Sequence, residues 1–475
     1  MREHRRIRLT FVSGMLVLAA NWGQVFASEP EAYPVSEWTI DIIDDESVVG
    51  YFVSAATDPV SGETFISYYE GIDGDLWLAR SDPPGAGNCG PGDTWECQVV
   101  DSAGVVGKYS SIAVGGPGPV ANLFISYYDV TNGSLKVLEG TVDRATGSLS
   151  YSTNIIEAGD TTEHYYVGTR TAVVVDALFG WAHIGYQVRN PNSEHIRYTK
   201  RVVQGTGNCG EGAAANAWEC DTIHIGTNVG EFIDIDMLDE SWLHMAFIDA
   251  DESYTFPVLA RKVGAGGGNC NGSDSWVCAP IRLACNDIGE WVSLVVGGDG
   301  SVHLAYSNST MDTVEWATNV TSGTGNCGSG SYSWDCRWID DVGSPAVLPG
   351  IDIETDDDFN PIIVYQVEEG WDVNLKIARP LEALSWPASG NCGPLSPSYF
   401  PTWRCETLDV GGVSYAHAAG GLSIAMNGNG DAAVAYRSLD LYTDEGFLKV
   451  AMEPASIFTD GFESGDTSRW SGAVP

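Results

Sequence analysis

The sequence predicts an all-β protein, a seven-bladed β-propeller built from four-stranded blades. Three observations support this: short alternating strands separated by Gly-, Asn- and Asp-rich turns, cysteine pairs that recur about every 60 residues, and a strand ending that occurs seven times. No long segment shows the period of an amphipathic helix, which argues against helical folds. A repeat of this length is typical of propellers and of other repeat arrays.

Each repeat contains four predicted strands. The first has the form aromatic-x-Ser/Asp-aliphatic, as at 109–112 and 291–294, and the third follows a polar loop, as at 76–79 and 448–451. The fourth carries the motif Trp-x-Cys and a β-rich tail, as at 95–101. The second ends in a small or aliphatic residue and an aromatic one in all seven repeats: Ser67-Tyr68, Ser126-Tyr127, Gly185-Tyr186, Ala246-Phe247, Ala305-Tyr306, Val364-Tyr365 and Ala435-Tyr436.

The N-terminal strand is expected to complete the last blade. The seventh repeat has no fourth strand after Val450, whereas residues 38–44 match residues 95–101, with Ile40 at the cysteine position. Pairing of this strand with the last blade closes the ring and removes exposed sheet edges. The predicted organisation is a signal peptide at 1–27, a short linker at 28–35, the propeller at 36–457 and a C-terminal tail at 458–475.

The first 27 residues predict export. Four arginines precede an apolar stretch, and Val25-Phe26-Ala27 forms a small-residue cleavage pattern before Ser28. An uncleaved membrane anchor is the alternative for this segment. No later segment approaches the ~20 apolar residues that a transmembrane helix needs. We therefore expect a secreted or periplasmic protein.

Ten of the 11 cysteines fall into close pairs, each within one local segment of the form Gly-Asn-Cys followed by Trp-x-Cys. In an exported protein this pattern predicts five local disulfides. Zinc ligation is the alternative, but the spacing within pairs varies, whereas zinc knuckles are tightly spaced. Cys285 is left over, as a free thiol or an intermolecular link. The predicted pairs are Cys89/Cys97, Cys209/Cys220, Cys270/Cys278, Cys327/Cys336 and Cys392/Cys405.

The charge balance excludes several partners. The chain has 23 Lys and Arg against 64 Asp and Glu, a formal net charge of −41. Such a chain repels phosphates, so neither a nucleic acid nor an anionic membrane is expected as a partner. We expect a monomer with a soluble acidic surface. Part of that surface is assigned to the acidic ends of the repeats, Asp44, Asp101, Asp340 and Asp409.

Residues 88–95, Asn-Cys-Gly-Pro-Gly-Asp-Thr-Trp, resemble a degenerate Asp-box, the S-x-D-x-G-x-T-W turn of sialidase-like propellers. Residues 269–276 have the same length and a similar ending. The resemblance implies a propeller with the box between strands three and four. Residues 125–136 resemble repeats of exported bacterial propellers, and residues 458–471 resemble a short C-terminal motif of secreted bacterial proteins. A disordered tail is the alternative for that last segment.

Candidate site residues gather on one predicted face, where loops join strand four to the next strand one and strand two to strand three. Side chains three residues before the Ser/Asp of strand one are expected at the channel mouth. They give a basic arc, Lys108 and Arg170, facing an acidic arc, Glu231 and Glu290. A solvated rim of ion pairs is the alternative. The ligand-binding candidates are Tyr51, Lys108, Arg170, Asp129, Arg189, Asp249 and Arg437.

Two functions fit this face. The first is the binding of an extracellular ligand, a glycan or a protein. The alternative is a sialidase-like or other glycan-active hydrolase, in which Glu231 and Glu290 supply the acid and the base or nucleophile of glycoside cleavage. The distance between two such carboxylates decides that mechanism, so the sequence leaves both functions open.

No metal or other cofactor is expected. His183, His244 and His303 occupy one position of strand two in repeats 3 to 5, where other repeats have Phe65 or Phe124. Exchange with Phe indicates a packing position between blades. Structural Ca²⁺ bound by the acidic run 354–358 is the alternative, because Ca²⁺ prefers oxygen ligands, although the run lacks an EF-hand pattern.

Overall fold

The computed structural model describes residues 38–46, 48–81, 87–250, 255–281, 288–328, 333–342, 350–369, 372–381, 390–395, 401–409, 421–427, 430–440 and 445–453. The predicted signal peptide, linker and tail lie outside these residues, as does Cys285. The chain divides into two compact units, Met1–Glu37 and Trp38–Pro475, and the described residues belong to the second. Their only helical element is the 3₁₀ turn Gly212–Ala214, so none of their helices has the length and apolarity of a membrane span.

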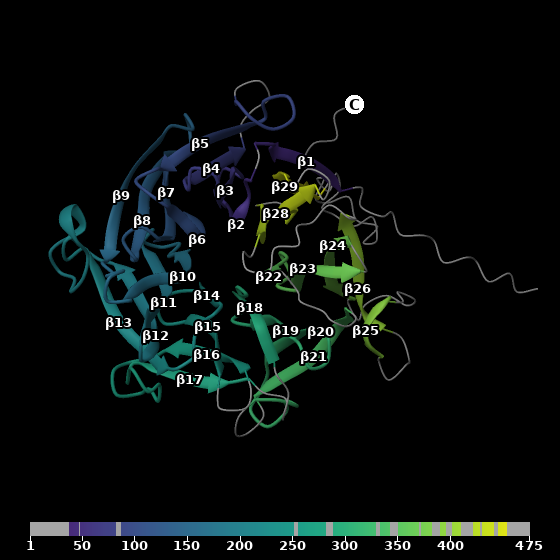
Figure 1. Ribbon diagram of the computed structural model, residues 1–475. Helices are drawn as coiled ribbons and strands as arrows, with labels where there is room; N and C mark the ends of the chain where they lie inside the picture. The colour runs from purple at the N-terminus through teal and green to yellow at the C-terminus, as the bar shows by residue number, and fades with distance from the viewer. Residues whose placement is uncertain are drawn as a thin grey trace, which may run out of the picture. The chain divides into compact units, whose positions relative to one another are not determined.

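The strands of the described residues form seven antiparallel sheets, each of which is one blade (Figure 1). The fold class predicted from the sequence is thereby confirmed. Blade 6 carries a fifth, outer strand, β25. The strands are, in blade 1, β2 (Tyr51–Thr57), β3 (Thr64–Tyr69), β4 (Leu76–Ser81) and β5 (Trp95–Asp101); in blade 2, β6 (Val106–Gly115), β7 (Val120–Asp129), β8 (Ser134–Asp143) and β9 (Leu149–Glu157); in blade 3, β10 (Tyr166–Val175), β11 (Ala182–Asn190), β12 (Ser193–Arg201) and β13 (Trp218–Gly226); in blade 4, β14 (Ile233–Met237), β15 (Leu243–Ala250), β16 (Thr255–Lys262) and β17 (Trp276–Pro280); in blade 5, β18 (Ile288–Val296), β19 (Val302–Asn308), β20 (Thr313–Asn319) and β21 (Trp334–Asp341); in blade 6, β22 (Ile351–Thr355), β23 (Pro361–Glu369), β24 (Asp372–Pro380), β26 (Pro401–Asp409) and β25 (Cys392–Leu395); in blade 7, β27 (Leu422–Met426), β28 (Ala432–Asp440), β29 (Glu445–Met452) and β1 (Thr39–Asp44).

The first strand of each blade lies innermost and surrounds a central channel (Figure 1). These strands contact one another in chain order, and β27 of blade 7 contacts β2 of blade 1. The apolar core lies between neighbouring blades, where one cluster joins Ile196 and Tyr198 of blade 3 to Met245 and Trp276 of blade 4. Each blade therefore buries its faces against its two neighbours.

The first strand of the ring belongs to the last blade. β1 pairs antiparallel with β29, with Thr39 opposite Met452 and Asp41 opposite Val450. This is the pairing expected from the match between residues 38–44 and 95–101. That the ring depends on this strand for its closure stays a prediction.

The Ser/Asp position of strand one links neighbouring blades. Its side chain accepts a hydrogen bond from the backbone N–H of the next blade's first strand, which ties the inner strands together around the channel. The sequence motif thus has a structural role that the sequence alone did not reveal. These bonds join Ile112 N to Ser54 Oγ (3.1 Å), Val173 N to Ser111 Oγ (3.1 Å), Leu294 N to Asp234 Oδ2 (2.7 Å), Ile424 N to Asp352 Oδ2 (2.9 Å) and Ala55 N to Ser423 Oγ (3.1 Å).

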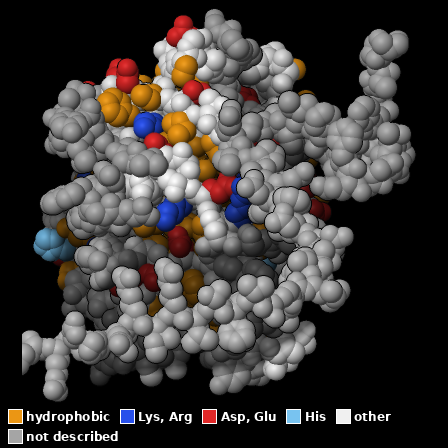
Figure 2. Space-filling model, turned by 90° about the vertical axis from the view of Figure 1, so that its right-hand side faces the viewer, with side chains coloured by type: hydrophobic (Ala, Val, Ile, Leu, Met, Phe, Trp, Pro, Cys, Tyr) orange, Lys and Arg blue, Asp and Glu red, His pale blue; other side chains and the backbone are white. Residues whose placement is uncertain are grey.

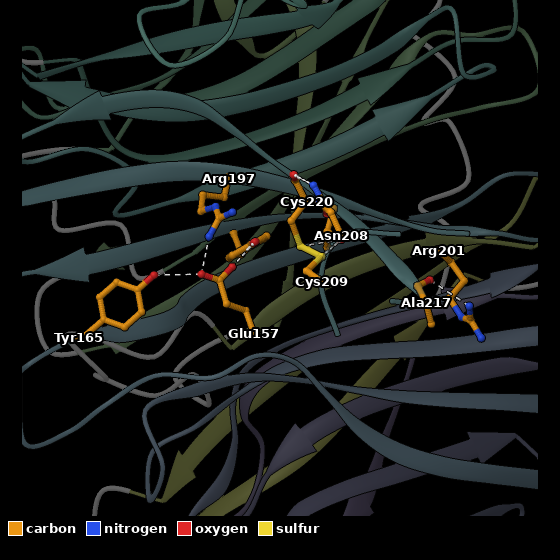
Figure 3. The surroundings of a disulfide bond; sticks show 10 residues. Glu157, Tyr165, Arg197, Arg201, Asn208, Cys209, Ala217 and Cys220 are labelled. Atoms are coloured by element: carbon orange, nitrogen blue, oxygen red, sulfur yellow. Dashed lines mark hydrogen bonds and ion pairs between the residues drawn. A yellow bond between two sulfur atoms is a disulfide. The ribbon is translucent and has the colours of Figure 1, made fainter. Parts of the chain in front are cut away.

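A second contact explains the recurring tyrosine of strand two. Its hydroxyl donates to the carboxylate at the end of the preceding blade's fourth strand, and a Lys or Arg of strand three joins four of these five contacts. In blade 3 the acceptor is Glu157, which also accepts from the hydroxyl of Tyr165, the residue before β10, and forms an ion pair with Arg197 (Figure 3). We call this contact the brace. Its donor and acceptor pairs are Tyr68–Asp44 (2.7 Å), Tyr127–Asp101 (2.7 Å), Tyr186–Glu157 (2.7 Å), Tyr365–Asp340 (2.8 Å) and Tyr436–Asp409 (2.7 Å).

The brace corrects one expectation. The acidic strand ends were expected on a solvated surface, yet Asp44 is 6% exposed and Asp101 8% exposed. The physical reason is that each fully buried tyrosine hydroxyl needs an acceptor, which the strand end of the previous blade supplies.

All five predicted disulfides are present, so the pairing expected from the cysteine spacing is confirmed. Each lies within one blade, in or beside the connection between strands three and four. The disulfides therefore staple turns and do not join one blade to another. The bonded pairs and their Cα–Cα distances are Cys89–Cys97 (5.9 Å), Cys209–Cys220 (6.0 Å), Cys270–Cys278 (5.1 Å), Cys327–Cys336 (6.0 Å) and Cys392–Cys405 (5.9 Å).

The asparagine before the first cysteine of each pair holds the backbone of the second. In blade 3, Asn208 Nδ2 donates to Cys220 O (3.0 Å) and Cys220 N donates to Asn208 Oδ1 (2.7 Å; Figure 3). The glycine that precedes this asparagine is also required, because a Cβ on Gly207 would lie 2.0 Å from Trp218 O. The Gly-Asn-Cys motif thus shapes the turn that the disulfide closes.

Candidate functional site

The channel mouth is lined by one side chain from each of five consecutive blades, two residues before the Ser/Asp position. The ring centroids of Phe52 and Tyr109 lie 4.2 Å apart, and those of Phe232 and Trp291 lie 4.0 Å apart. Arg170 lies between these pairs, with its Cζ 3.9 Å from the Tyr109 centroid and 5.6 Å from the Phe232 centroid. We call this continuous row the mouth belt. It lines a cavity of about 170 Å³.

Irregular backbone presents the belt side chains of blades 1 and 2. The pairing register shifts between Tyr51 and Ser54 and between Lys108 and Ser111, which are bulges of the inner strands. Phe52 has a φ of 53° and Tyr109 a φ of 55°. Such left-handed backbone costs about 1–3 kcal/mol for a non-glycine residue and is concentrated at functional sites. The strained aromatic pair therefore marks the mouth as a candidate site.

The predicted alignment of Arg170 is off by one residue. In blade 3, Ala172 pairs with Gly185 as Ser111 pairs with Ser126 in blade 2. Thr169 is thus the equivalent of Lys108, and Arg170 is the equivalent of Tyr109. The sequence hides this register, because Ala172 occupies the position where a Ser or Asp is expected.

Three predicted cations lie on this face against aromatic rings. The Nζ of Lys108 lies 5.4 Å from the Tyr69 centroid, and the Cζ of Arg437 lies 3.8 Å from the Tyr51 centroid. Arg170 donates through Nε to the backbone oxygen of Glu231 at 2.6 Å. Within the described residues, neither Lys108 nor Arg170 contacts a carboxylate. Elsewhere cations lie beside acidic groups, as Lys136 beside Asp101 and Arg197 beside Glu157. On another side of the molecule, Figure 2 shows Lys or Arg side chains next to Asp or Glu side chains.

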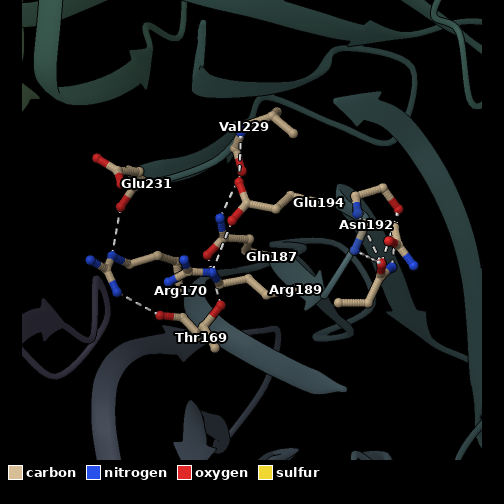
Figure 4. Close-up of polar contacts among 10 residues, drawn as sticks. Thr169, Arg170, Gln187, Arg189, Asn192, Glu194, Val229 and Glu231 are labelled. Atoms are coloured by element: carbon tan, nitrogen blue, oxygen red, sulfur yellow. Dashed lines mark hydrogen bonds and ion pairs between the residues drawn. The ribbon is translucent and has the colours of Figure 1, made fainter. Parts of the chain in front are cut away.

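A second cavity, of about 560 Å³, adjoins the belt between blades 2 and 3. Arg170 lines the first cavity, and its NH1 donates to the backbone oxygen of Thr169, which lines the second (2.8 Å; Figure 4). Arg189 and Glu194 form an ion pair of 2.9 Å at the second cavity, and Val229 N holds Glu194 at 2.9 Å. Its volume is typical of a small-ligand pocket. Six of its lining residues are Tyr128, His164, Tyr166, Thr169, Arg189 and Glu194.

The remaining candidates do not converge on the mouth belt. Asp129 is 1% exposed and accepts hydrogen bonds within its own turn from Asn132 N (3.0 Å) and Nδ2 (2.8 Å). Asp249 pairs with His224 at 2.9 Å. Glu231 is exposed, and the side chain of Glu290 lies outside the described part of the chain. The structure therefore gives no carboxylate separation for the hydrolase hypothesis.

Below the mouth, four carboxyl groups line a channel cavity of about 310 Å³: Asp234 and Asp236 of β14, and Asp352 and Glu354 of β22. Burial, reinforced by Asp352, raises the pKa of Asp234 to about 7, and burial raises the pKa of Asp236 to about 6. Burial also raises the pKa of Asp352 and of Glu354. Much of the channel's formal negative charge is therefore absent in weakly acidic solution.

One hydroxyl supports this protonation independently. Ser293 Oγ lies 2.8 Å from Asp234 Oδ2 and 2.6 Å from Asp352 Oδ1. A serine hydroxyl carries one hydrogen and donates to only one of these oxygens. The second contact is a hydrogen bond only when that carboxyl is protonated and donates to Ser293.

The predicted Ca²⁺ ligands serve different parts of the fold. Glu354 lines the channel, whereas Asp356 Oδ1 accepts the N–H groups of Asp358 (3.0 Å) and Asn360 (2.8 Å) in its own turn. Of the histidines, His183 is 0% exposed, His244 2% and His303 6%, as expected for a packing position.

Sequence reasoning missed the belt position itself. The aromatic residue of the strand-one motif was used only to align the repeats. Its recurrence at 52, 109, 232 and 291 could have indicated that it lines the channel mouth. It also missed His164 and Tyr166 as a pair, joined by a 3.1 Å contact between Nδ1 and Oη.

No protein-family model matches the chain, and no curated protein sequence matches it. Solved structures with a distant likeness include a polysaccharide lyase, Uly1, at 8% identity and a TM-score of 0.41, covering 88% of this chain and 100% of the lyase. An alpha-L-arabinofuranosidase from Lactobacillus brevis has 7% identity and a TM-score of 0.32, covering 72% and 89%. The Bacillus subtilis arabinanase Arb43A has 10% identity and a TM-score of 0.29, covering 72% and 92%. A likeness at this level carries no conclusion about activity.

Proposed function

We propose that the protein is an extracellular ligand-binding propeller whose channel-mouth face binds a carbohydrate. The mouth belt is the observation that carries this proposal. The partly exposed rings of Tyr109, Phe232 and Trp291 offer flat apolar surfaces that suit the apolar faces of sugar rings, and Arg170 offers donors to sugar oxygens. Lys108 and Arg170 support it further, because they keep no carboxylate partner among the described residues of a chain that has 64 acidic side chains.

The second cavity extends the same proposal. Tyr128, Tyr166 and His164 line it beside the Arg189–Glu194 ion pair. This mixture of rings, donors and acceptors suits a terminal sugar, while the belt receives the units that follow. The compartment is proposed on separate grounds: five disulfides and the predicted signal peptide at 1–27 favour a secreted or periplasmic protein.

A glycan array probed with the full chain tests the proposal, with the same glycans assayed for cleavage in parallel. We expect binding that falls about tenfold in Phe232→Ala, since one aromatic contact contributes about 0.5–1.5 kcal/mol beyond its area burial. Phe179→Ala is the matched control, because Phe179 is 57% exposed in the turn at the other end of blade 3. Equal binding by both variants, or no bound glycan, contradicts the proposal.

The cleavage assay decides the hydrolase alternative. If the wild type releases sugar and Glu231→Gln does not, the protein is a hydrolase, and the proposed binding function is wrong. Binding without release, unchanged in Glu231→Gln, supports the proposed function.

A further inference from the structure

A group of three potential ligands lies between blades 3 and 4, beyond the end of β10 that is far from the mouth belt. Asp176 follows β10 directly, His183 is the second residue of β11, and Glu240 lies in the turn between β14 and β15. Each offers one ligand atom, and these atoms all lie within 4.8 Å of one another. Asp176 is 4% exposed and His183 is 0% exposed.

The imidazole of His183 has one engaged and one unengaged nitrogen. Its Nδ1 lies 2.6 Å from Tyr198 Oη, whereas its buried Nε2 has no hydrogen-bond partner among the described residues. Metal-binding histidines show this arrangement, in which a second residue fixes the ring through one nitrogen and the other nitrogen meets the ion.

Asp176 lacks the cation that its counterpart in blade 1 possesses. Asp58 begins the same kind of turn, in which its backbone oxygen accepts Gly62 N at 2.8 Å. Both carboxylate oxygens of Asp58 are bound by Arg144, at 2.7 and 2.8 Å. In the described part of the chain, the Asp176 carboxylate accepts only from the backbone N–H groups of Leu178 and Phe179. A buried carboxylate without a counter-charge is costly, and a cation at Asp176 would take the role of Arg144.

We propose that Asp176, His183 and Glu240 bind a divalent transition-metal ion of the Zn²⁺ type. One imidazole nitrogen and two carboxylates are ligands that Zn²⁺ accepts, with water completing the coordination, whereas Ca²⁺ prefers oxygen ligands alone. The Glu240 side chain is 40% exposed and gives access from solvent. Two positive charges oppose cation binding here. Lys200 Nζ lies 3.8 Å from Glu240 Oε1 and 3.6 Å from Glu219 Oε2, and Lys262 Nζ lies 3.3 Å from Tyr198 Oη.

The test uses the full, disulfide-bonded chain after treatment with a chelator. Zinc is titrated by calorimetry and counted by elemental analysis after dialysis. We expect one tightly bound Zn²⁺ per chain and none at this affinity in His183→Phe. Phenylalanine fits this position, because Phe65 and Phe124 hold it in blades 1 and 2. The matched control is His244→Phe, which removes the equivalent buried histidine of blade 4, and it should keep the zinc.

Three further variants grade the site. Asp176→Asn should weaken zinc binding at least about tenfold, and Tyr198→Phe should weaken it by about 10–100-fold by freeing the imidazole. Lys200→Gln should tighten binding by removing one of the two opposing charges. Zinc should raise the melting temperature of the wild type and leave that of His183→Phe unchanged. Zinc bound equally by the wild type and His183→Phe, no zinc bound, or Ca²⁺ bound more tightly than Zn²⁺ would overturn the inference.

Discussion

Two sets of carboxyl groups lie inside this acidic ring, and they differ in what faces them. In the brace, Asp101 receives Tyr127 at 2.7 Å and forms an ion pair with Lys136. In the channel, Asp234 and Asp352 share Ser293 and have no cation contact among the described residues. Burial alone would raise the pKa of Asp101, but hydrogen bonds from Lys136 and Tyr127 outweigh it and lower that pKa, whereas the pKa of Asp234 is raised to about 7. A cation partner therefore decides whether a buried carboxyl keeps its charge.

The largest expected effect comes from removing that cation. Lys136→Met leaves Asp101 buried and charged without its ion pair, and we expect the free energy of unfolding to fall by about 3–5 kcal/mol. Denaturant unfolding followed by tryptophan fluorescence measures it. Arg337→Met is the control, because Arg337 is 44% exposed in its pair with Asp335 and should cost no more than about 1 kcal/mol. Similar losses in the free energy of unfolding would contradict the expectation that the buried ion pair contributes more to stability than the surface pair.

The channel carboxyls predict that the free energy of unfolding falls as the pH rises, which is opposite to the effect of a carboxyl paired with a cation. The pKa of Asp234 is about 7 when folded against a usual 3.8, so between these values the folded chain holds more protons than the unfolded one. Its contribution to stability is present at low pH and is lost as the pH rises through about 7. We expect the free energy of unfolding to rise from pH 8 to pH 5, and this gain should be smaller by about 2 kcal/mol in Asp234→Asn, as measured by denaturant unfolding at each pH.

Asp58 provides the contrast for that experiment. Burial would raise its pKa, but hydrogen bonds from Arg144 and Ser61 lower it to about 2. Its contribution is therefore present above about pH 4 and is lost as the pH falls toward 2. If Asp234→Asn retains the wild-type slope between pH 8 and pH 5, Asp234 does not contribute to this pH dependence.

The smallest expected effect concerns the contribution of the tyrosine hydroxyl to the brace. Tyr127→Phe removes one donor from Asp101 while the ion pair with Lys136 and the bond from Ala103 N remain. We expect a loss of about 1–2 kcal/mol in chemical denaturation, well below that of Lys136→Met. Blade 4 already has Phe247 at this position, so the variant should fold. A loss as large as that of Lys136→Met would show that the tyrosine hydroxyl contributes as much to stability as the cation does.

The fold was predictable from the sequence because its signals are local and repeated. Strand alternation, the small-residue–aromatic ending and the Gly-Asn-Cys to Trp-x-Cys segments each lie within one repeat. The partners that matter for the candidate sites come from different repeats. Asp176 and Glu240 meet across a blade boundary, and His183 resembles a packing residue because Phe65 and Phe124 occupy its position.

The pairing register of the bulged inner strands was the other feature that the sequence could not determine. A bulge adds a residue to a strand without leaving a mark in the hydrophobic pattern, so the place of Arg170 could only be assigned to within one residue. The proton shared around Ser293 was equally hidden, because it depends on two carboxyls that belong to blades 4 and 6.

The pairing of β1 with β29 bears on how the chain is made. The strand that emerges early from the ribosome waits for a partner that is synthesised near the end, and long-range pairing of this kind slows folding. Until β1 and β29 have paired, β1 remains open to other chains or to proteases, and so does the outer edge of β29 once it has been made. A chain truncated before β29 would therefore leave β1 without its partner, and an unpaired strand of this kind is open to aggregation.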